Sequence, residues 1–170
     1  GVCNGNNNSC NGSIYLGEYS DGIIPVFYSA GSDVGGFQFN VDGASITSAS
    51  GGASSTFAST GGLTSTSSMV LGFSFSGDTI ESTDGSLLLN LGLEGIAGEE
   101  VCLFGEVLSD ATGGTMFLPP ESSCFTLPEV ALDISYDFAQ DITGFQFDLA
   151  GLNVISASGG DAEAAGFTVS

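Results

Sequence analysis

The charge balance is the feature that most limits what this chain can fold into. The sequence of 170 residues contains 20 Asp and Glu but no Lys, Arg or His, which gives a formal net charge of -20 at pH 7. Ion pairs between side chains are therefore excluded, and the fold must rest on apolar burial, backbone hydrogen bonds and disulfides. Repulsion between carboxylates disfavours compaction unless counterions or Ca²⁺ screen it.

The same charge balance excludes two classes of partner. Binding to nucleic-acid phosphates requires cations that replace counterions, and attraction to anionic lipids requires Lys or Arg. Apolar residues make up 42% of the chain, but they occur in runs far shorter than the roughly 18 residues that a membrane-spanning helix needs. We therefore expect no nucleic-acid partner and no membrane insertion.

Apolar and polar residues alternate in many short segments, which is the pattern of half-buried β-strands. Turn residues separate the segments every 8–12 positions or so, which predicts an all-β fold, an antiparallel immunoglobulin-like β-sandwich of roughly eight or nine strands. We also predict a short strand over residues 55–60, a bulge at Gly72 and at most one helical turn over residues 161–167. The alternating apolar positions include Ile24, Val26, Tyr28, Phe37, Phe39, Val41, Leu87, Leu89, Leu91 and Leu93.

The chain repeats itself at an offset of 108 residues. Residues 36–52 and 144–160 are identical at ten of 17 positions, which comprise GFQF, one glycine and SASGG. We therefore divide the chain into an N-terminal segment (1–23), a complete sandwich unit (24–128) and an incomplete second repeat (129–170). Upstream of the quoted motif, the aligned pairs are Ile24 and Leu132, Val26 and Ile134, Tyr28 and Tyr136, and Asp33 and Asp141.

Four cysteines indicate two disulfides and an extracellular location. Three pairings are open, and we favour the two local closures, Cys3–Cys10 and Cys102–Cys124; without His or a C-x-x-C pair, a metal site at these cysteines is disfavoured. Asn7 and Asn11 begin glycosylation sequons beside the first closure, with Ser- or Thr-linked sugar as the alternative. Because the sequence starts with Gly rather than Met, either a targeting segment has been removed or this is a piece of a longer chain.

Acidic residues are the remaining candidates for chemistry, and we interpret them as solvated turn residues rather than as a catalytic site. Without His, Lys or Arg, most general bases and cationic stabilisers of a transition state are missing, so we predict no enzyme activity. Carboxylate pairs that could act alone are Glu99 with Glu100, and Asp78 with Glu81 and Asp84. No cofactor is certain, but Ca²⁺ fits acids in Gly-adjacent loops; these candidates are Asp21, Asp42, Asp78, Asp84 and Asp110.

Three motifs in order, GFQFNVDGASITSAS, DGSLLLNLGLEG and GEVLSDATGGTM, carry a resemblance to a known fold family. They resemble the cohesin-like, immunoglobulin-like β-sandwich of secreted bacterial scaffold and surface proteins, over residues 24–118 and again over 131–158. The chain is also similar to tandem modules of large acidic surface or filament proteins from aquatic bacteria. The resemblance implies a jelly-roll-like sandwich used for extracellular cohesion and does not imply dockerin binding.

The unfinished repeat leads to the functional hypothesis, because a few strands with one apolar face are not stable alone in water. We expect a structural subunit of an extracellular bacterial fibril or surface assembly, which polymerises with itself head-to-tail by β-strand complementation or by tandem repetition. Phe145, Phe147 and Leu149 should be buried by strands from another subunit, a further C-terminal stretch or the first unit. The alternative is a secreted adhesin or carbohydrate-binding module with glycan partners. The predicted assembly face comprises Ile14 and Leu16 of the donor strand, and Ile134, Tyr136, Phe145, Phe147 and Leu149.

Overall fold

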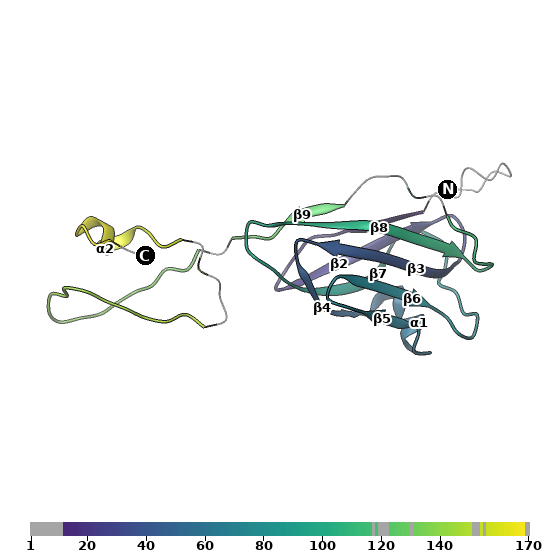
Figure 1. Cartoon of the computed structure of the whole chain (residues 1–170), viewed down its shortest axis with the longest axis horizontal. Coiled ribbons are helices and arrows are strands. Elements are labelled where there is room, and N and C mark those ends of the chain that lie inside the picture. The colour runs from purple at the N-terminus through teal and green to yellow at the C-terminus, as the bar shows by residue number, and fades with distance from the viewer. Residues whose placement is uncertain are drawn as a thin grey trace. The chain divides into compact units, whose positions relative to one another are not determined.

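The chain divides into two units, Gly1–Leu127 (unit 1) and Pro128–Ser170 (unit 2). The nine strands found in the described residues all lie in unit 1 (Figure 1). Among the described residues, no helix is long and apolar enough to cross a membrane. The computed structural model describes residues 12–116, 118, 123–129, 131–150, 154 and 156–168.

Unit 1 is a sandwich of two antiparallel sheets, which confirms the predicted all-β fold class. One sheet has the strand order β1-β2-β7-β4, and the other has the order β5-β6-β3-β8-β9. The strands are β1 (Ser13–Leu16), β2 (Ile23–Ala30), β3 (Val34–Asp42), β4 (Ser45–Ser50), β5 (Leu63–Ser65), β6 (Met69–Phe73), β7 (Thr83–Glu94), β8 (Glu100–Asp110) and β9 (Cys124–Thr126).

Both sheets combine strands from distant parts of the sequence. β7 lies between β2 and β4, where Leu89 pairs with Val26 and Leu91 pairs with both Ile24 and Ala49. In the other sheet, β3 lies between β6 and β8. We call residues 12–61, with β1 to β4, the opening half of unit 1, and residues 62–127, with β5 to β9, its closing half.

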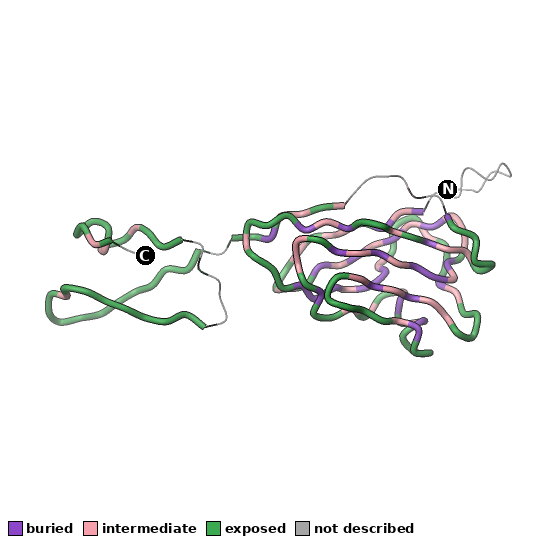
Figure 2. Tube along the Cα trace, viewed as in Figure 1, coloured by how far each residue is buried: buried purple, intermediate pink, exposed green. Residues whose placement is uncertain are grey.

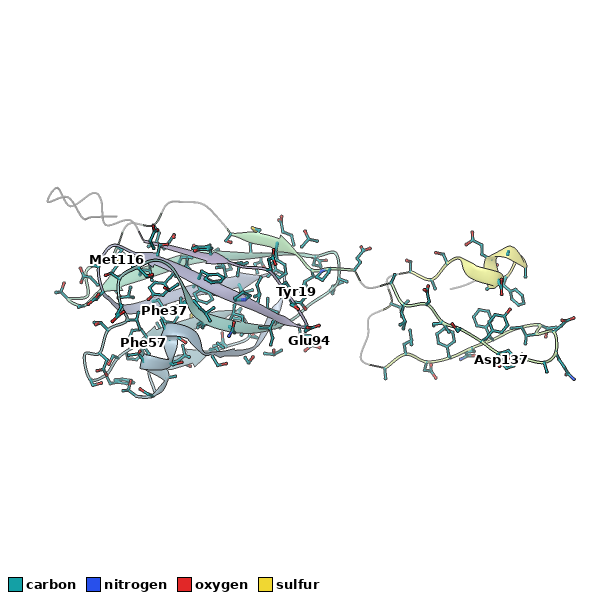
Figure 3. The ribbon with its side chains drawn as sticks, turned by 180° about the vertical axis from the view of Figure 1, so that it is seen from behind. Tyr19, Phe37, Phe57, Glu94, Met116 and Asp137 are labelled. Carbon is teal, nitrogen blue, oxygen red and sulfur yellow. A yellow bond between two sulfur atoms is a disulfide. The ribbon has the colours of Figure 1, made fainter. Side chains whose placement is uncertain are left out.

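The core of unit 1 lies between the two sheets, as the buried stretches in Figure 2 show. The alternation read from the sequence places Ile24 and Val26 inward from one sheet, and Phe37 and Phe39 inward from the other. Each fully buried side chain of this size contributes roughly 1.5–3 kcal/mol relative to exposure. Phe37 and Phe57, labelled in Figure 3, are in contact inside this core, with ring centroids 6.0 Å apart.

Two local predictions for unit 1 are wrong. Residues 55–60 do not form a strand; a 3-10 turn (Gly52–Ser54) leads into the short helix α1 (Ser55–Ala58), which turns Phe57 into the core. Gly72 is not a bulge, because it pairs regularly with Phe37. A Cβ on Gly72 would lie 2.3 Å from Phe37 Cε1, so this glycine makes room for the ring.

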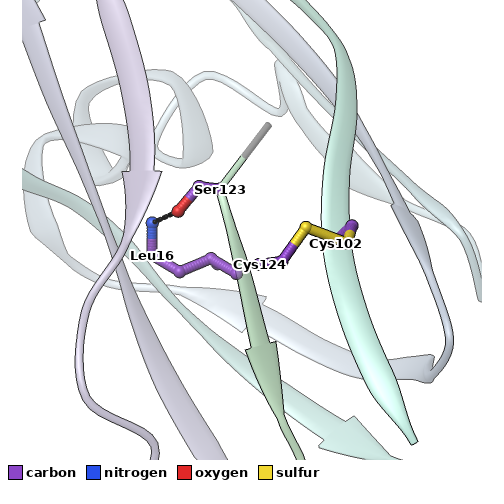
Figure 4. The surroundings of a disulfide bond; sticks show 4 residues. All are labelled: Leu16, Cys102, Ser123 and Cys124. Carbon is purple, nitrogen blue, oxygen red and sulfur yellow. Dashed lines mark hydrogen bonds between the residues drawn. A yellow bond between two sulfur atoms is a disulfide. The ribbon is translucent and has the colours of Figure 1, made fainter. Parts of the chain in front are cut away.

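A disulfide joins Cys102 and Cys124, which face each other across β8 and β9 (Figure 4). β9 is only three residues long, and the backbone N–H of Leu16 donates to the hydroxyl of Ser123 just before it. The bond therefore fixes a short edge strand that backbone hydrogen bonds alone hold weakly. The predicted Cys3–Cys10 pair and the sequons at Asn7 and Asn11 lie outside the described residues.

Replacing Cys102 and Cys124 together by Ala should lower the free energy of unfolding of unit 1 by about 3 kcal/mol, because the loop between them is no longer closed in the unfolded state. Urea denaturation of the full chain, followed by near-ultraviolet circular dichroism, measures this loss. Thr126→Ala, an exposed change on the same strand, is the control and should shift the midpoint little. An unchanged midpoint in the double variant would contradict the prediction.

Unit 2 does not contain the strands that the repeat predicts. Its described residues 131–138 and 142–149 run without strand pairing, and its helix is α2 (Gly160–Ala164), in the predicted place. The missing strands have a physical reason. In unit 1 the equivalent segments pair with β6, β7 and β8 of the closing half, and the described residues of unit 2 include no counterpart of these strands. A strand without neighbours has no partner for its backbone groups.

Candidate assembly surface in unit 2

The largest group of exposed apolar side chains in the described residues of unit 2 coincides with the core positions of the repeat. Eight of its large apolar residues are 39–62% exposed. At the offset of 108 residues, every one of them aligns with a residue of unit 1 that is at most 8% exposed. The aligned pairs are Leu132 with Ile24, Ile134 with Val26, Tyr136 with Tyr28, Phe138 with Ala30, Phe145 with Phe37, Phe147 with Phe39, Leu149 with Val41 and Val154 with Ile46.

We call these eight residues of unit 2 the open face. The expectation that Phe145, Phe147 and Leu149 are buried is not met in the single chain, where they are 47%, 49% and 39% exposed. Exposed apolar residues scattered singly are normal on proteins. Here neighbouring rings are exposed together, with Tyr136 beside Phe138 and Phe145 beside Phe147, and exposed apolar groups of this kind mark interaction sites.

The aromatic residues of unit 2 reproduce the arrangement of the unit 1 core. The centroids of Phe145 and Phe147 are 6.2 Å apart, as are those of Phe37 and Phe39. A third ring joins each pair, with Phe167 at 6.1 Å from Phe145 and Phe57 at 6.0 Å from Phe37. The open face is therefore already ordered in part like the inside of a sandwich.

The glycine pairs at which the helical turns begin are also alike. Gly51 and Gly159 have the same backbone angles, φ 83° and ψ -168°. The next glycines, Gly52 and Gly160, both have positive φ, at 56° and 65°. A side chain would be strained at these angles, which explains why SASGG precedes a helical turn in both units.

Tyr136 is the member of the open face whose polar contact differs from that of its counterpart. The hydroxyl of Tyr28 donates to the backbone carbonyl of Glu81, in the closing half, at 2.8 Å. The hydroxyl of Tyr136 donates instead to Oδ2 of Asp161, in α2, at 2.9 Å. This hydrogen bond and the charge of Asp161 raise the pKa of the Tyr136 phenol, whereas burial is the main cause that raises the pKa of Tyr28.

Asp161→Asn should therefore lower the pKa of Tyr136 toward the usual value of about 10, because it removes the charged acceptor that favours the protonated phenol. A pH titration of the tyrosine ¹³Cζ resonances of the full chain measures this, with Tyr136→Phe to assign the signal. Tyr28 is the internal control and should titrate as in the wild type. An unchanged Tyr136 titration would contradict the described contact with Asp161.

The predicted donor-strand residues lie in unit 1. β1 pairs antiparallel with β2, so that Ile14 lies opposite Tyr28 and Leu16 opposite Val26. Ile14 is 4% exposed and belongs to the unit 1 core. To complete another subunit, this strand would have to leave its own sheet; its role as a donor stays a prediction.

The predicted calcium ligands do not gather in the described residues. Asp21 lies in a tight turn with φ 52°, and Asp78 accepts hydrogen bonds from Ser74 and Ser76 in its own loop. Asp110 accepts from the backbone and hydroxyl of Thr112 and from the Gly114 backbone, which lowers its pKa. Among the described residues, the one close group of three ligand-type side chains is Glu100 with Cys102 and Cys124, whose sulfurs form the disulfide.

The predicted assembly face does not include five residues that shape the open face: Leu132, Phe138, Val154, Phe167 and Asp161. Phe138 aligns with a small residue, Ala30, which gives no signal of a core position. Phe167 aligns with Phe57 only if two residues are inserted after the glycine pair, which a fixed offset of 108 residues does not find. Allowing that insertion places FTVS (167–170) on FAST (57–60) and would have extended the repeat.

Comparison with known proteins adds a similarity to cohesins. No family model matches the sequence, and no curated protein matches it. The solved structures that are similar include a non-cellulosomal cohesin from the archaeon Archaeoglobus fulgidus, with 15% identity, a TM-score of 0.46 and coverage of 70% of this chain and 92% of the cohesin.

Two complexes are similar at the same level. The sixth cohesin of scaffoldin B from Acetivibrio cellulolyticus, solved with a Cel5 dockerin, has 19% identity, a TM-score of 0.47 and coverage of 69% of this chain and 97% of that one. The CaDoc0917–CaCohA2 complex has 10% identity, a TM-score of 0.49 and coverage of 68% and 99%. The fold assignment for this chain rests on its own strand order.

Proposed function

We propose that the protein is a structural subunit of an extracellular fibril or surface assembly, and that unit 2 is the joint at which polypeptides are connected by β-strand complementation. The observation that carries this proposal is the open face, whose eight residues align one by one with core residues of unit 1. A face with this pattern is suited to being covered by further strands, which supply both apolar area and main-chain hydrogen bonds.

A role outside the cell is supported by the disulfide between Cys102 and Cys124, because disulfides persist mainly in oxidising compartments. The charge supports the same role, since a protein with no Lys or Arg offers no site to trypsin-like proteases. The net charge of -20 also makes association between copies sensitive to salt, because screening weakens their mutual repulsion.

The open face favours a structural role over the alternative of a carbohydrate-binding module. Aromatic residues that bind sugars form platforms on a finished surface. In unit 2, the exposed aromatic residues Tyr136, Phe145 and Phe147 instead occupy positions that are core positions in unit 1.

If unit 2 is a joint, the purified full chain should associate in a concentration-dependent way, more strongly with added salt or CaCl₂. Phe147→Ser should weaken this association by about tenfold or more, because burying a Phe side chain contributes roughly 1.5–3 kcal/mol. Sedimentation velocity measures the association, and negative-stain microscopy shows whether fibres or arrays form.

Phe75→Ser is the matched control, because Phe75 is 73% exposed but belongs to a loop of unit 1. It should leave the association unchanged. A wild-type chain that stays monomeric at every concentration and salt condition would overturn the proposal that copies join at unit 2.

A further inference from the structure

Unit 1 shows what covers the open face when the sandwich is complete. Its closing half makes three consecutive polar contacts to the opening half, through Ile80, Glu81 and Ser82. Ile80 exchanges two backbone hydrogen bonds with Val34, at 2.8 and 2.9 Å. The carbonyl of Glu81 accepts from Tyr28 at 2.8 Å, and the N–H of Ser82 donates to Oδ1 of Asp33 at 3.0 Å.

The opening-half partners in these contacts recur in unit 2. Tyr28 and Asp33 recur as Tyr136 and Asp141, and Val34 is replaced by the similar residue Ile142. Asp141 is exposed, and neither its carboxylate nor the backbone of Ile142 has a hydrogen-bond partner among the described residues. Asp33 is exposed in unit 1 as well, so its recurrence as Asp141 is explained by the contact to the closing half and not by core packing.

The space around a conserved position of the repeat, Gly36 in unit 1 and Gly144 in unit 2, also indicates that a closing half fits against unit 2. A Cβ on Gly36 would lie 3.2 Å from Ser109 Oγ and 3.3 Å from the carbonyl oxygen of Gly72, because β6 and β8 pass close on both sides. Gly36 has no positive φ that would require glycine. A Cβ on its counterpart Gly144 would have no atom within 4 Å. No described residue of unit 2 therefore requires glycine at this position, whereas a neighbour that approached as β6 and β8 do would require it.

We propose that unit 2 binds a polypeptide segment with the chemistry of the unit 1 closing half. The segment begins with an extended tripeptide that contacts Ile142, Tyr136 and Asp141, and continues into a leucine-rich strand like β7. That strand lies beside the segment that holds Ile134, as β7 lies beside β2. This inference builds on the proposed role of unit 2 as a joint and names what the joint accepts.

The probe for the test is a synthetic peptide with the sequence of residues 77–94, which contains the tripeptide and β7. Added to the full chain, it should bind, as measured by fluorescence anisotropy. It should also slow backbone hydrogen exchange over residues 132–149. A peptide with Ser82→Pro lacks the N–H that would donate to Asp141 and should bind about tenfold more weakly or worse.

The matched pair of chain variants is Asp141→Ala and Asp33→Ala. Asp141→Ala should weaken peptide binding by about tenfold or more, because it removes a charged acceptor from the complex. Asp33→Ala removes the equivalent acceptor from unit 1 and should leave peptide binding at unit 2 unchanged. Protection confined to unit 1, or equal binding by the two chain variants, would overturn the inference.

The outcomes for the joint and for the segment that it accepts are separable. If the wild-type chain associates but the peptide neither binds nor protects residues 132–149, the proposed function stands and this inference falls. If the chain stays monomeric but the peptide binds at unit 2, the inference stands and self-association is excluded. If neither occurs, both proposals are overturned.

Discussion

The insertion of β7 between β2 and β4 is the interaction on which the rest of the fold depends. β7 supplies the fully buried Leu88, Leu89 and Leu91 and hydrogen-bonds to strands on both sides. Without it, β2 and β4 have no common neighbour, and the first sheet falls apart into separate segments. Unit 2 shows this consequence, because the repeat of the opening sequence, identical at ten of 17 positions over residues 144–160, forms no strands in its described residues. Strand formation here is a property of the complete pairing and not of the local sequence.

The absence of cations determines how the acidic residues are used. In the described residues, carboxylates act as acceptors for nearby N–H and O–H groups, as Asp33 does for Ser82 and Glu163 for the Gly159 backbone. In these contacts a donor dipole offsets the negative charge of the carboxylate, which ion pairs do in other proteins. The other contribution to a sandwich in a chain with a net charge of -20 is a core that is almost wholly apolar.

The sequence was sufficient to predict the fold class and most of the inward-facing residues, because alternation directly reflects which face of a strand is buried. It predicted residues 55–60 wrongly, because a short helix that places Phe57 in the core has too few residues to show a helical period. The open face was visible in the repeat, but the contact from Ser82 to Asp33 was not. Such a contact joins residues 49 positions apart, and only the fold brings them together.

The two units agree in features that depend on local sequence and differ in features that depend on distant strands. The paired rings and the glycine turn are the same in both units, with Phe37–Phe39 and Phe145–Phe147 each at 6.2 Å. The strands differ, because the described residues of unit 2 include no closing half. Unit 2 is therefore pre-arranged at its aromatic centre, whereas its described segments 131–138 and 142–149 have no strand pairing. When a segment binds and completes unit 2, the loss of conformational entropy is therefore smaller around the rings than along the strands. Affinity would then arise mainly from the apolar face, and selectivity from the Asp141 and Ile142 contacts that fix the register.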